Sequence, residues 1–367
     1  MSGDLINFLQ EVAPDSAEIA MLQPADPFLE SAGEDLRRRI FLTETIEGRL
    51  MCLRPEFTIP LCLHHLDASA SAARYNYAGS VFRQNRAGSN EFQQAGLEDI
   101  GNSDFASADA ACLSDMMAAL ARCGVDDFTI TLGDQELFAG IVRSIDLPEA
   151  IANRLLRCFG DQDLLERQIA QLSDKAEQND NPDIAANIAS SGDLDALTDH
   201  VSALLAQANI SPKSGRSAED IAQRMIEKVQ KASFVLSASQ EAALRAFLSI
   251  DVPLADATGT LEKFECDHEV RFNGAIDVFK RRVSELSKRN VDLSPLTFKA
   301  SFGRKIDYYT GMLFEAHVKG RPDAIAGGGR YDRLCSLLGS GEPIPAVGFS
   351  IMLDRVAALL GSQGSAS

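Results

Sequence analysis

A short stretch of the chain combines a cation, a carboxylate and two aromatic hydroxyls within a few residues. It contains Arg304, Asp307, Tyr308 and Tyr309. An arginine supplies a permanent positive charge, a carboxylate accepts hydrogen bonds, and a tyrosine supplies both a ring and a hydroxyl. Such a set suits the recognition of a small zwitterion that carries a ring. The sequence therefore predicts a small-molecule site here.

A run of three glycines follows at 327–329, next to Arg330. Consecutive glycines are costly in backbone entropy, so they mark a sharp turn or a close approach to another group. A tight hairpin turn and a close approach of the backbone to a bound ligand explain the run equally well. Between the two blocks, residues 312–319 alternate with the two-residue period of a strand. We therefore expect one strand flanked by two special loops.

The spacing of apolar residues predicts the elements that position these blocks. We expect helices over 2–12, 61–66, 102–123, 137–141 and 273–286, and strands over 41–45, 50–53, 75–82, 92–100, 128–132 and 296–302. From about 148 to 261 strand signals nearly vanish, which indicates a helical insert with loops at Asn179–Pro182 and Ser211–Gly215. We predict a core in two parts, 1–147 and 263–362, a helical insert at 148–262 and a tail at 363–367.

The composition is that of an ordinary globular protein with one large domain and a smaller insert. The 367 residues are 45% hydrophobic and carry a net charge of −18, which weighs against a nucleic-acid binder. The seven cysteines and five histidines show no metal-ligand spacing, and no apolar run approaches the roughly 20 residues of a membrane helix. We expect a cytoplasmic protein without a metal, a cofactor or a membrane segment.

Five blocks of the sequence resemble histidyl-tRNA synthetase, a class II aminoacyl-tRNA synthetase. They occur in the order found in that family, and the resemblance covers about 20–145 and 260–360. The blocks are Leu53–Thr58, Phe82–Arg86, Phe92–Gly101, the histidine-reading region at Gly303–Gly311 with Gly327–Asp332, and Pro345–Arg355. The resemblance implies an α+β fold, with a class II synthetase core made of a mainly antiparallel sheet flanked by helices.

The resemblance also implies roles for two polar residues and one arginine in the first two blocks. The residues that match Glu56 and Thr58 hold the amino group of histidine in the family's enzymes, and a carboxylate with a hydroxyl suits an ammonium group away from water. The arginine that matches Arg83 bridges the amino-acid carboxylate and the nucleotide phosphate, for which a planar guanidinium is suited. An isolated glutamate such as Glu56 is more commonly a solvated loop charge.

The later blocks supply the residues that the resemblance places around the imidazole ring. Gln94 and Glu98 match side chains that point toward the substrate, and their spacing puts them on one face of a strand. Taken alone, they would read as a solvent-facing polar stripe. Tyr308 and Tyr309 match tyrosines that contact the ring, and Arg304 matches an arginine that also assists the reaction.

Several positions depart from the pattern of the catalytic enzymes. Asn85 replaces a glutamate that contacts ATP, and Met352 replaces a glycine against the nucleotide, where a thioether would crowd an adenine. Phe57 and Lys305 each stand where glycine is usual. Only about a dozen residues follow Arg355, so we expect no anticodon-binding domain.

These departures make the chain resemble the regulatory subunit of the short-form ATP phosphoribosyltransferase, a synthetase-like paralogue. That family implies a subunit without catalysis of its own, which supports a separate short catalytic subunit, a glycosyltransferase, in the first step of L-histidine biosynthesis. It also implies a histidine sensor, a homodimer and a hetero-octamer of four regulatory and four catalytic chains. The alternatives are a catalytic histidyl-tRNA synthetase-like ligase that lacks an anticodon domain, and a scaffold whose amino-acid site is inactive.

Overall fold

The computed structural model describes residues 3–86, 88–173, 184–191, 193–207, 217–304 and 308–364. The predicted loops at Asn179–Pro182 and Ser211–Gly215 lie outside the described residues, as do Lys305 and Asp307. The chain forms two compact units. The first comprises Met1–Ser144, Phe159–Gln162 and Ala246–Ser367, and the second comprises Ile145–Cys158 and Asp163–Arg245.

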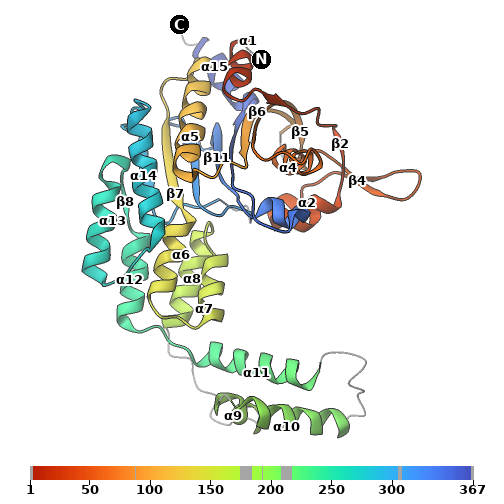
Figure 1. Ribbon diagram of the computed structural model, residues 1–367, viewed down its shortest axis with the longest axis vertical. Helices are drawn as coiled ribbons and strands as arrows, with labels where there is room; N and C mark the ends of the chain where they lie inside the picture. The colour runs from red at the N-terminus through yellow and green to blue at the C-terminus, as the bar shows by residue number, and fades with distance from the viewer. Residues whose placement is uncertain are drawn as a thin grey trace. The chain divides into compact units, whose positions relative to one another are not determined.

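A nine-stranded sheet forms the centre of the first unit (Figure 1). Its strands, in spatial order, are β1 (Asp15–Ser16), β5 (Ala73–Phe82), β6 (Glu91–Ile100), β12 (Ala346–Met352), β11 (Ala326–Arg330), β10 (Met312–His317), β7 (Thr129–Asp134), β9 (Leu296–Lys299) and β8 (Asp251–Pro253). Neighbouring strands run antiparallel, apart from the parallel pairs β1–β5 and β7–β9. The prediction of a mainly antiparallel sheet is therefore confirmed.

Helices surround this sheet, as the α+β prediction requires. In the first unit they are α1 (Gly3–Val12), α2 (Asp26–Ser31), α3 (Glu34–Arg37), α4 (Thr58–Asp67), α5 (Phe105–Arg122), α6 (Gln135–Ser144), α13 (Leu254–His268), α14 (Gly274–Lys288), the short π-helix Ser336–Ser340 and α15 (Leu353–Gly364). Helix α5 begins after Asp104, whose side chain accepts a hydrogen bond from the backbone N–H of Ser107, and it packs on β6, β11, β12 and α14.

A second, three-stranded sheet has the order β2 (Leu22–Pro24), β4 (Leu50–Leu53) and β3 (Leu42–Glu44). Strands β3 and β4 pair antiparallel as the predicted hairpin. Gly48 in the connecting turn has φ +79°, a conformation that glycine adopts without strain. Among the described residues, no helix is both long and apolar enough to cross a membrane.

The glycine run does not form the predicted second loop. Gly327, Gly328 and Gly329 lie inside β11, in the middle of the large sheet. A Cβ atom on Gly328 would lie 2.1 Å from the carbonyl oxygen of Gly348, and one on Gly329 would lie 2.6 Å from that of Met312. The glycines are therefore needed for close approach within a sheet and not for a turn.

The second unit is helical. Its helices are α7 (Glu149–Arg157), α8 (Gln162–Ser173), α9 (Ile184–Ser191), α10 (Leu194–Gln207), α11 (Ala218–Ser233) and most of α12 (Ala238–Leu248). Small and branched apolar side chains, among them Ala189, Leu197 and Ala222, form a core between α9, α10 and α11.

Several stretches differ from the predicted boundaries. Residues 145–147 group with the second unit and residues 159–162 with the first. Residues 246–262 belong to the first unit, because β8 pairs antiparallel with β9 and α13 packs on α14. A strand as short as β8 is too brief for the two-residue period to be visible. At the other end of the chain, α15 continues through residues 363 and 364, which were predicted to be tail.

Candidate functional site

The first unit encloses a cavity of about 390 Å³, which we call the ligand cavity. This volume lies near the lower end of the range for small-molecule sites. All eight residues that the sequence analysis assigned to histidine line it. They are Glu56, Thr58, Arg83, Gln94, Glu98, Arg304, Tyr308 and Tyr309. The structure thus brings together residues from both parts of the core, although the identity of the ligand stays a prediction.

Glu56 is fixed at the beginning of α4. Its carboxylate accepts hydrogen bonds from the backbone N–H groups of Thr58 and Ile59, the latter at 2.9 Å. Burial raises the pKa of Glu56, whereas these two hydrogen bonds and the positive charge of Arg83 oppose the increase. The N-terminal end of a helix favours a negative charge. The two backbone hydrogen bonds and Arg83 therefore stabilise the charged form of Glu56, while burial opposes it.

Glu98 lies on β6 and is only 2% exposed. One carboxylate oxygen, Oε1, accepts a hydrogen bond from the hydroxyl of Thr58 at 2.7 Å, and Oε2 accepts one from the hydroxyl of Tyr331. Burial raises the pKa of Glu98 to about 8, although both hydrogen bonds favour the charged form. Glu98 is thus a carboxyl group that can be neutral near physiological pH.

Gly348 on β12 is the residue opposite Glu98 in the sheet. A Cβ atom built on Gly348 would lie 1.6 Å from Oε2 of Glu98. Heavy atoms cannot approach so closely, so any other residue would displace the carboxyl group. Gly348 therefore makes room for Glu98.

Aromatic rings line much of the ligand cavity. Phe57 stacks on Tyr77 with ring centroids 4.5 Å apart, and the guanidinium of Arg54 lies 4.0 Å from the centroid of Phe57. The rings of Tyr308 and Tyr331 meet edge to face at 5.9 Å. Phe57, at the position where the related enzymes usually have glycine, is 4% exposed and so forms part of the wall.

Three arginines, Arg39, Arg83 and Arg304, line both the ligand cavity and a second cavity of about 380 Å³. Two of them, Arg83 and Arg304, were assigned to the site from the sequence. Arg304 donates from Nε to Glu315 at 2.9 Å and from Nη1 to the hydroxyl of Tyr309 at 2.7 Å. Arg83 donates from Nε to the carbonyl oxygen of Pro55 at 2.8 Å. Their guanidinium groups can bind a carboxylate through charge-assisted hydrogen bonds.

Burial, together with nearby positive charges, lowers the pKa of Arg83. Burial is the main cause and lowers the pKa of Arg83 to about 10, and the positive charges of Arg39 and Arg304 contribute to the decrease. Glu56 opposes it. An anion bound between these guanidinium groups would relieve the repulsion.

Residues that depart from the catalytic pattern line the second cavity. Met352 lies between the two cavities, where its sulfur accepts a hydrogen bond from Nε2 of Gln94 at 3.3 Å. The side chain of Asn85 accepts from Arg39 and donates to the carbonyl oxygen of Ser89 at 2.7 Å. A thioether and an engaged amide thus occupy the positions at which nucleotide contacts were predicted to be lost.

The residues of the ligand cavity that the sequence analysis did not assign to it include Tyr77, Tyr331 and Gly348. Tyr331 follows the glycine run, and the two-residue period of a strand could have placed it on the same face as Gly327 and Gly329. In the part of the chain that the structure describes, no group of three or more His, Cys, Asp or Glu side chains could hold a metal ion.

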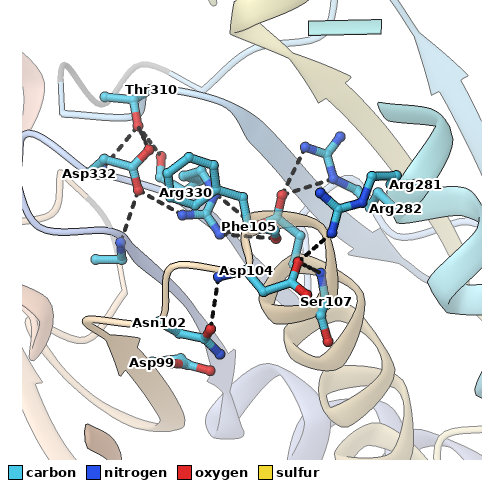
Figure 2. Close-up of polar contacts among 12 residues, drawn as sticks. Asp99, Asn102, Asp104, Phe105, Ser107, Arg281, Arg282, Thr310, Arg330 and Asp332 are labelled. Atoms are coloured by element: carbon cyan, nitrogen blue, oxygen red, sulfur yellow. Dashed lines mark hydrogen bonds and ion pairs between the residues drawn. The ribbon is translucent and has the colours of Figure 1, made fainter. Parts of the chain in front are cut away.

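A buried ionic cluster lies behind β11, on the face covered by α5 and α14 (Figure 2). Asp109 accepts hydrogen bonds from Arg330 at 2.6 Å and from Arg282 at 2.9 Å. Arg330 also donates to Asp332 at 2.7 Å, and Asp332 accepts from the hydroxyl of Thr310 at 3.2 Å. The cluster therefore ties β11, which Tyr331 follows directly, to α5 and α14 and to Thr310.

The sequence profile described as histidyl-tRNA synthetase matches residues 15–356. The ATP phosphoribosyltransferase regulatory subunit of Sinorhizobium medicae is 43% identical over 99% of this chain and 97% of its own length. The protein of the same name from Rhizobium meliloti is 43% identical over 97% of this chain and 95% of its own length.

Solved structures show the same fold. A protein from Bacillus halodurans, described as an ATP phosphoribosyltransferase regulatory subunit/histidyl-tRNA synthetase, has a TM-score of 0.65 at 20% identity and covers 96% of this chain and 77% of its own. Histidyl-tRNA synthetase from Nostoc has a TM-score of 0.63 at 16% identity, covering 98% and 71%. The predicted histidyl-tRNA synthetase-like fold is confirmed. On the evidence of the sequence relatives, the chain belongs to the family of ATP phosphoribosyltransferase regulatory subunits.

Proposed function

We propose that the chain is a non-catalytic regulatory subunit, which pairs with the short catalytic subunit of ATP phosphoribosyltransferase and is required for its activity in the first step of L-histidine biosynthesis. The observation that carries this proposal is the 43% identity to a relative of that name over 99% of the chain. The assembly that we propose is a cytoplasmic hetero-octamer built on a homodimer of this chain. The partner is a glycosyltransferase, and neither nucleic acid nor a membrane takes part.

We further propose that the ligand cavity senses L-histidine. Glu56 and Thr58 offer acceptors for the amino group, and Arg83 and Arg304 offer donors for the carboxylate. The aromatic side chains that line the ligand cavity suit the imidazole ring of histidine. Histidine can inhibit the partner only by favouring one arrangement of the complex, so the partner's substrates must weaken histidine binding by the same factor.

Co-purification with the short catalytic subunit tests the main proposal, followed by a phosphoribosyl-transfer assay. We expect a stable complex, activity only when both chains are present, and inhibition by histidine. A catalytic subunit that is equally active alone would contradict the proposal.

Exchange of labelled pyrophosphate into ATP separates this proposal from the catalytic alternative. A ligase would activate histidine and catalyse exchange that depends on histidine. We expect no exchange, because Met352 occupies the boundary between the cavities and Asn85 is held by Arg39. Exchange that requires histidine would refute the non-catalytic assignment.

Replacing Arg304 by methionine should weaken histidine binding by roughly ten- to a hundredfold, since a hydrogen bond to a charged group contributes about 1.5–3 kcal/mol. Isothermal titration calorimetry measures the change. Arg143→Met is the matched control, because Arg143 is 60% exposed in an ion pair with Glu136 and does not line the ligand cavity. Unchanged affinity in the Arg304 variant would contradict a role in carboxylate binding, and no binding by the unaltered protein would favour a scaffold.

A further inference from the structure

We infer, on the basis of the proposed histidine-sensing function, that Glu315 is a positioning residue that acts on the ligand through Arg304. Glu315 lies on β10 and was not among the residues that the sequence analysis assigned to the site. It fixes the guanidinium group of Arg304, so that the terminal N–H groups of this arginine stay in place for the carboxylate of the ligand.

Two acceptors hold the guanidinium group of Arg304. Oε1 of Glu315 accepts a hydrogen bond from Nε at 2.9 Å, and the hydroxyl of Tyr309 accepts one from Nη1 at 2.7 Å. An arginine has five N–H donors in a planar fork, of which the described residues use these two, so three donors on Nη1 and Nη2 are left for a ligand. Glu315 therefore holds Arg304 without competing with a bound carboxylate for the same N–H groups.

The backbone around Glu315 is more regular than the backbone around Arg304. Arg304 lies in no helix or strand, and it is the last described residue before residues 305–307. Glu315 lies on a strand inside the large sheet, opposite Gly327 of β11 and Thr131 of β7. Side chains on strands are held more precisely than side chains on loops. Glu315 can therefore fix Arg304 relative to the sheet.

The sheet leaves room for this ion pair at Gly327. A Cβ atom built on Gly327 would lie 3.1 Å from Cγ of Glu315 and 3.4 Å from Cζ of Arg304. Both distances are shorter than the optimal separation of two carbon atoms, so a side chain there would press on the pair. On the other side, Nε2 of His317 lies 3.4 Å from Oε2 of Glu315. Glu315 thus has a polar neighbour at each carboxylate oxygen.

The position of the pair explains why Arg304 needs an anchor. Arg304 and Glu315 line both cavities, and their side chains are 17% and 23% exposed. The second cavity is also lined by Asp354, a carboxylate toward which a released guanidinium group can turn. Glu315 therefore keeps Arg304 available to the ligand cavity.

The test uses the carboxylate preference, which we define as the Kd for histamine divided by the Kd for L-histidine. Histamine has the ring and the amino group of histidine but no carboxylate. If Glu315 were only a nearby negative charge, its removal would raise the preference, because like charges repel. We expect Glu315→Ala to lower the preference by about tenfold, the smaller end of the effect of a hydrogen bond to a charged group. Calorimetry at pH 7 measures both constants, and an unchanged or raised preference would overturn the inference.

Glu315→Gln is the conservative variant, because its amide oxygen can still accept from Nε of Arg304 although the charge is lost. It should restore most of the preference, and a loss as large as in Glu315→Ala would overturn positioning through this hydrogen bond. Glu136→Ala is the matched control, since Glu136 pairs with Arg143 and does not line the ligand cavity. It should leave the preference unchanged.

A double variant shows whether Glu315 acts through Arg304. In the Arg304→Met background, Glu315→Ala should lower the carboxylate preference no further, because the side chain that it positions is gone. An equal loss in both backgrounds would mean that Glu315 acts independently, which would overturn the inference.

Arg304→Lys gives a test that does not require any Glu315 variant to fold. Lysine keeps the positive charge but lacks the planar fork that can contact Glu315, Tyr309 and a ligand at once. It should lose about as much of the carboxylate preference as Arg304→Met does, and a retained preference would overturn the inference. If the unaltered protein does not bind histidine at all, the sensing function fails first and separately.

Discussion

Gly348→Ala should raise the Kd for L-histidine by at least about a hundredfold, the equivalent of about 2.7 kcal/mol. The added methyl carbon would lie 1.6 Å from Oε2 of Glu98 and 2.7 Å from the carbonyl oxygen of Leu97. The carboxyl group must therefore leave its hydrogen bonds with Thr58 and Tyr331, and the ligand cavity would lose both this group and the shape of its wall. Calorimetry with histidine at pH 7 measures the effect.

Gly259→Ala provides the matched control, since it adds the same methyl group elsewhere. Gly259 lies inside α13, and a Cβ there would meet nothing within 4 Å. Alanine is the better helix former, so the control should keep its affinity and gain about 0.5–1 kcal/mol of stability. If Gly348→Ala is folded by circular dichroism and binds within about threefold of the unaltered protein, Glu98 does not define the ligand cavity.

Asp109→Asn should lower the free energy of unfolding by about 1–3 kcal/mol, because two buried guanidinium groups lose the anion that they share, while Arg282 keeps Asp134 and Arg330 keeps Asp332. Asp109 is 0% exposed, and Arg282 and Arg330 are each 4% exposed. The amide keeps the size of the side chain but supplies no charge. Urea denaturation followed by circular dichroism measures the change.

Asp4→Asn is the control for this loss of charge. Asp4 forms an ion pair with Arg122 at 3.1 Å, and both side chains are more than half exposed. Exposed pairs contribute at most about 1 kcal/mol. A loss in Asp109→Asn no larger than in the control would mean that water enters the cluster and screens it. In that case the cluster would not hold β11 in place.

Strands with a clear period were predictable from the sequence, and shorter or glycine-rich elements were not. Strand β7 overlaps the predicted 128–132, where Phe128, Ile130 and Leu132 alternate with threonines, and β5 and β6 agree closely with the predicted 75–82 and 92–100. The glycine run carries no such pattern, so its place inside β11 could be known only from the neighbouring strands.

The beginning of α4 shows a different limit. Pro60 was taken to precede the helix, but α4 starts at Thr58 and includes the proline in its first turn. Proline is tolerated there because the first N–H groups of a helix have no partner within it. This detail has consequences for the site, since the same turn supplies the N–H groups that hold Glu56.

The eight residues of the candidate site came from resemblance to a family and not from pattern alone. Polar side chains such as Gln94 and Glu98 look like an ordinary surface stripe in the sequence, yet both are 2% exposed. The role of Gly348 depends on the register between β6 and β12, which pairs residues far apart in the chain. Local sequence carries no information on that pairing.

Arg330 is the last residue of β11, and Tyr331 follows it directly. Arg330 donates to Asp109 of α5, which also accepts from Arg282 of α14, and Tyr331 donates to Glu98 in the wall of the ligand cavity. A single peptide bond therefore separates the residue that anchors β11 to α5 from the residue that contacts Glu98. A movement of α5, or of α14 through Asp109, would therefore reach Glu98 through only a few side chains.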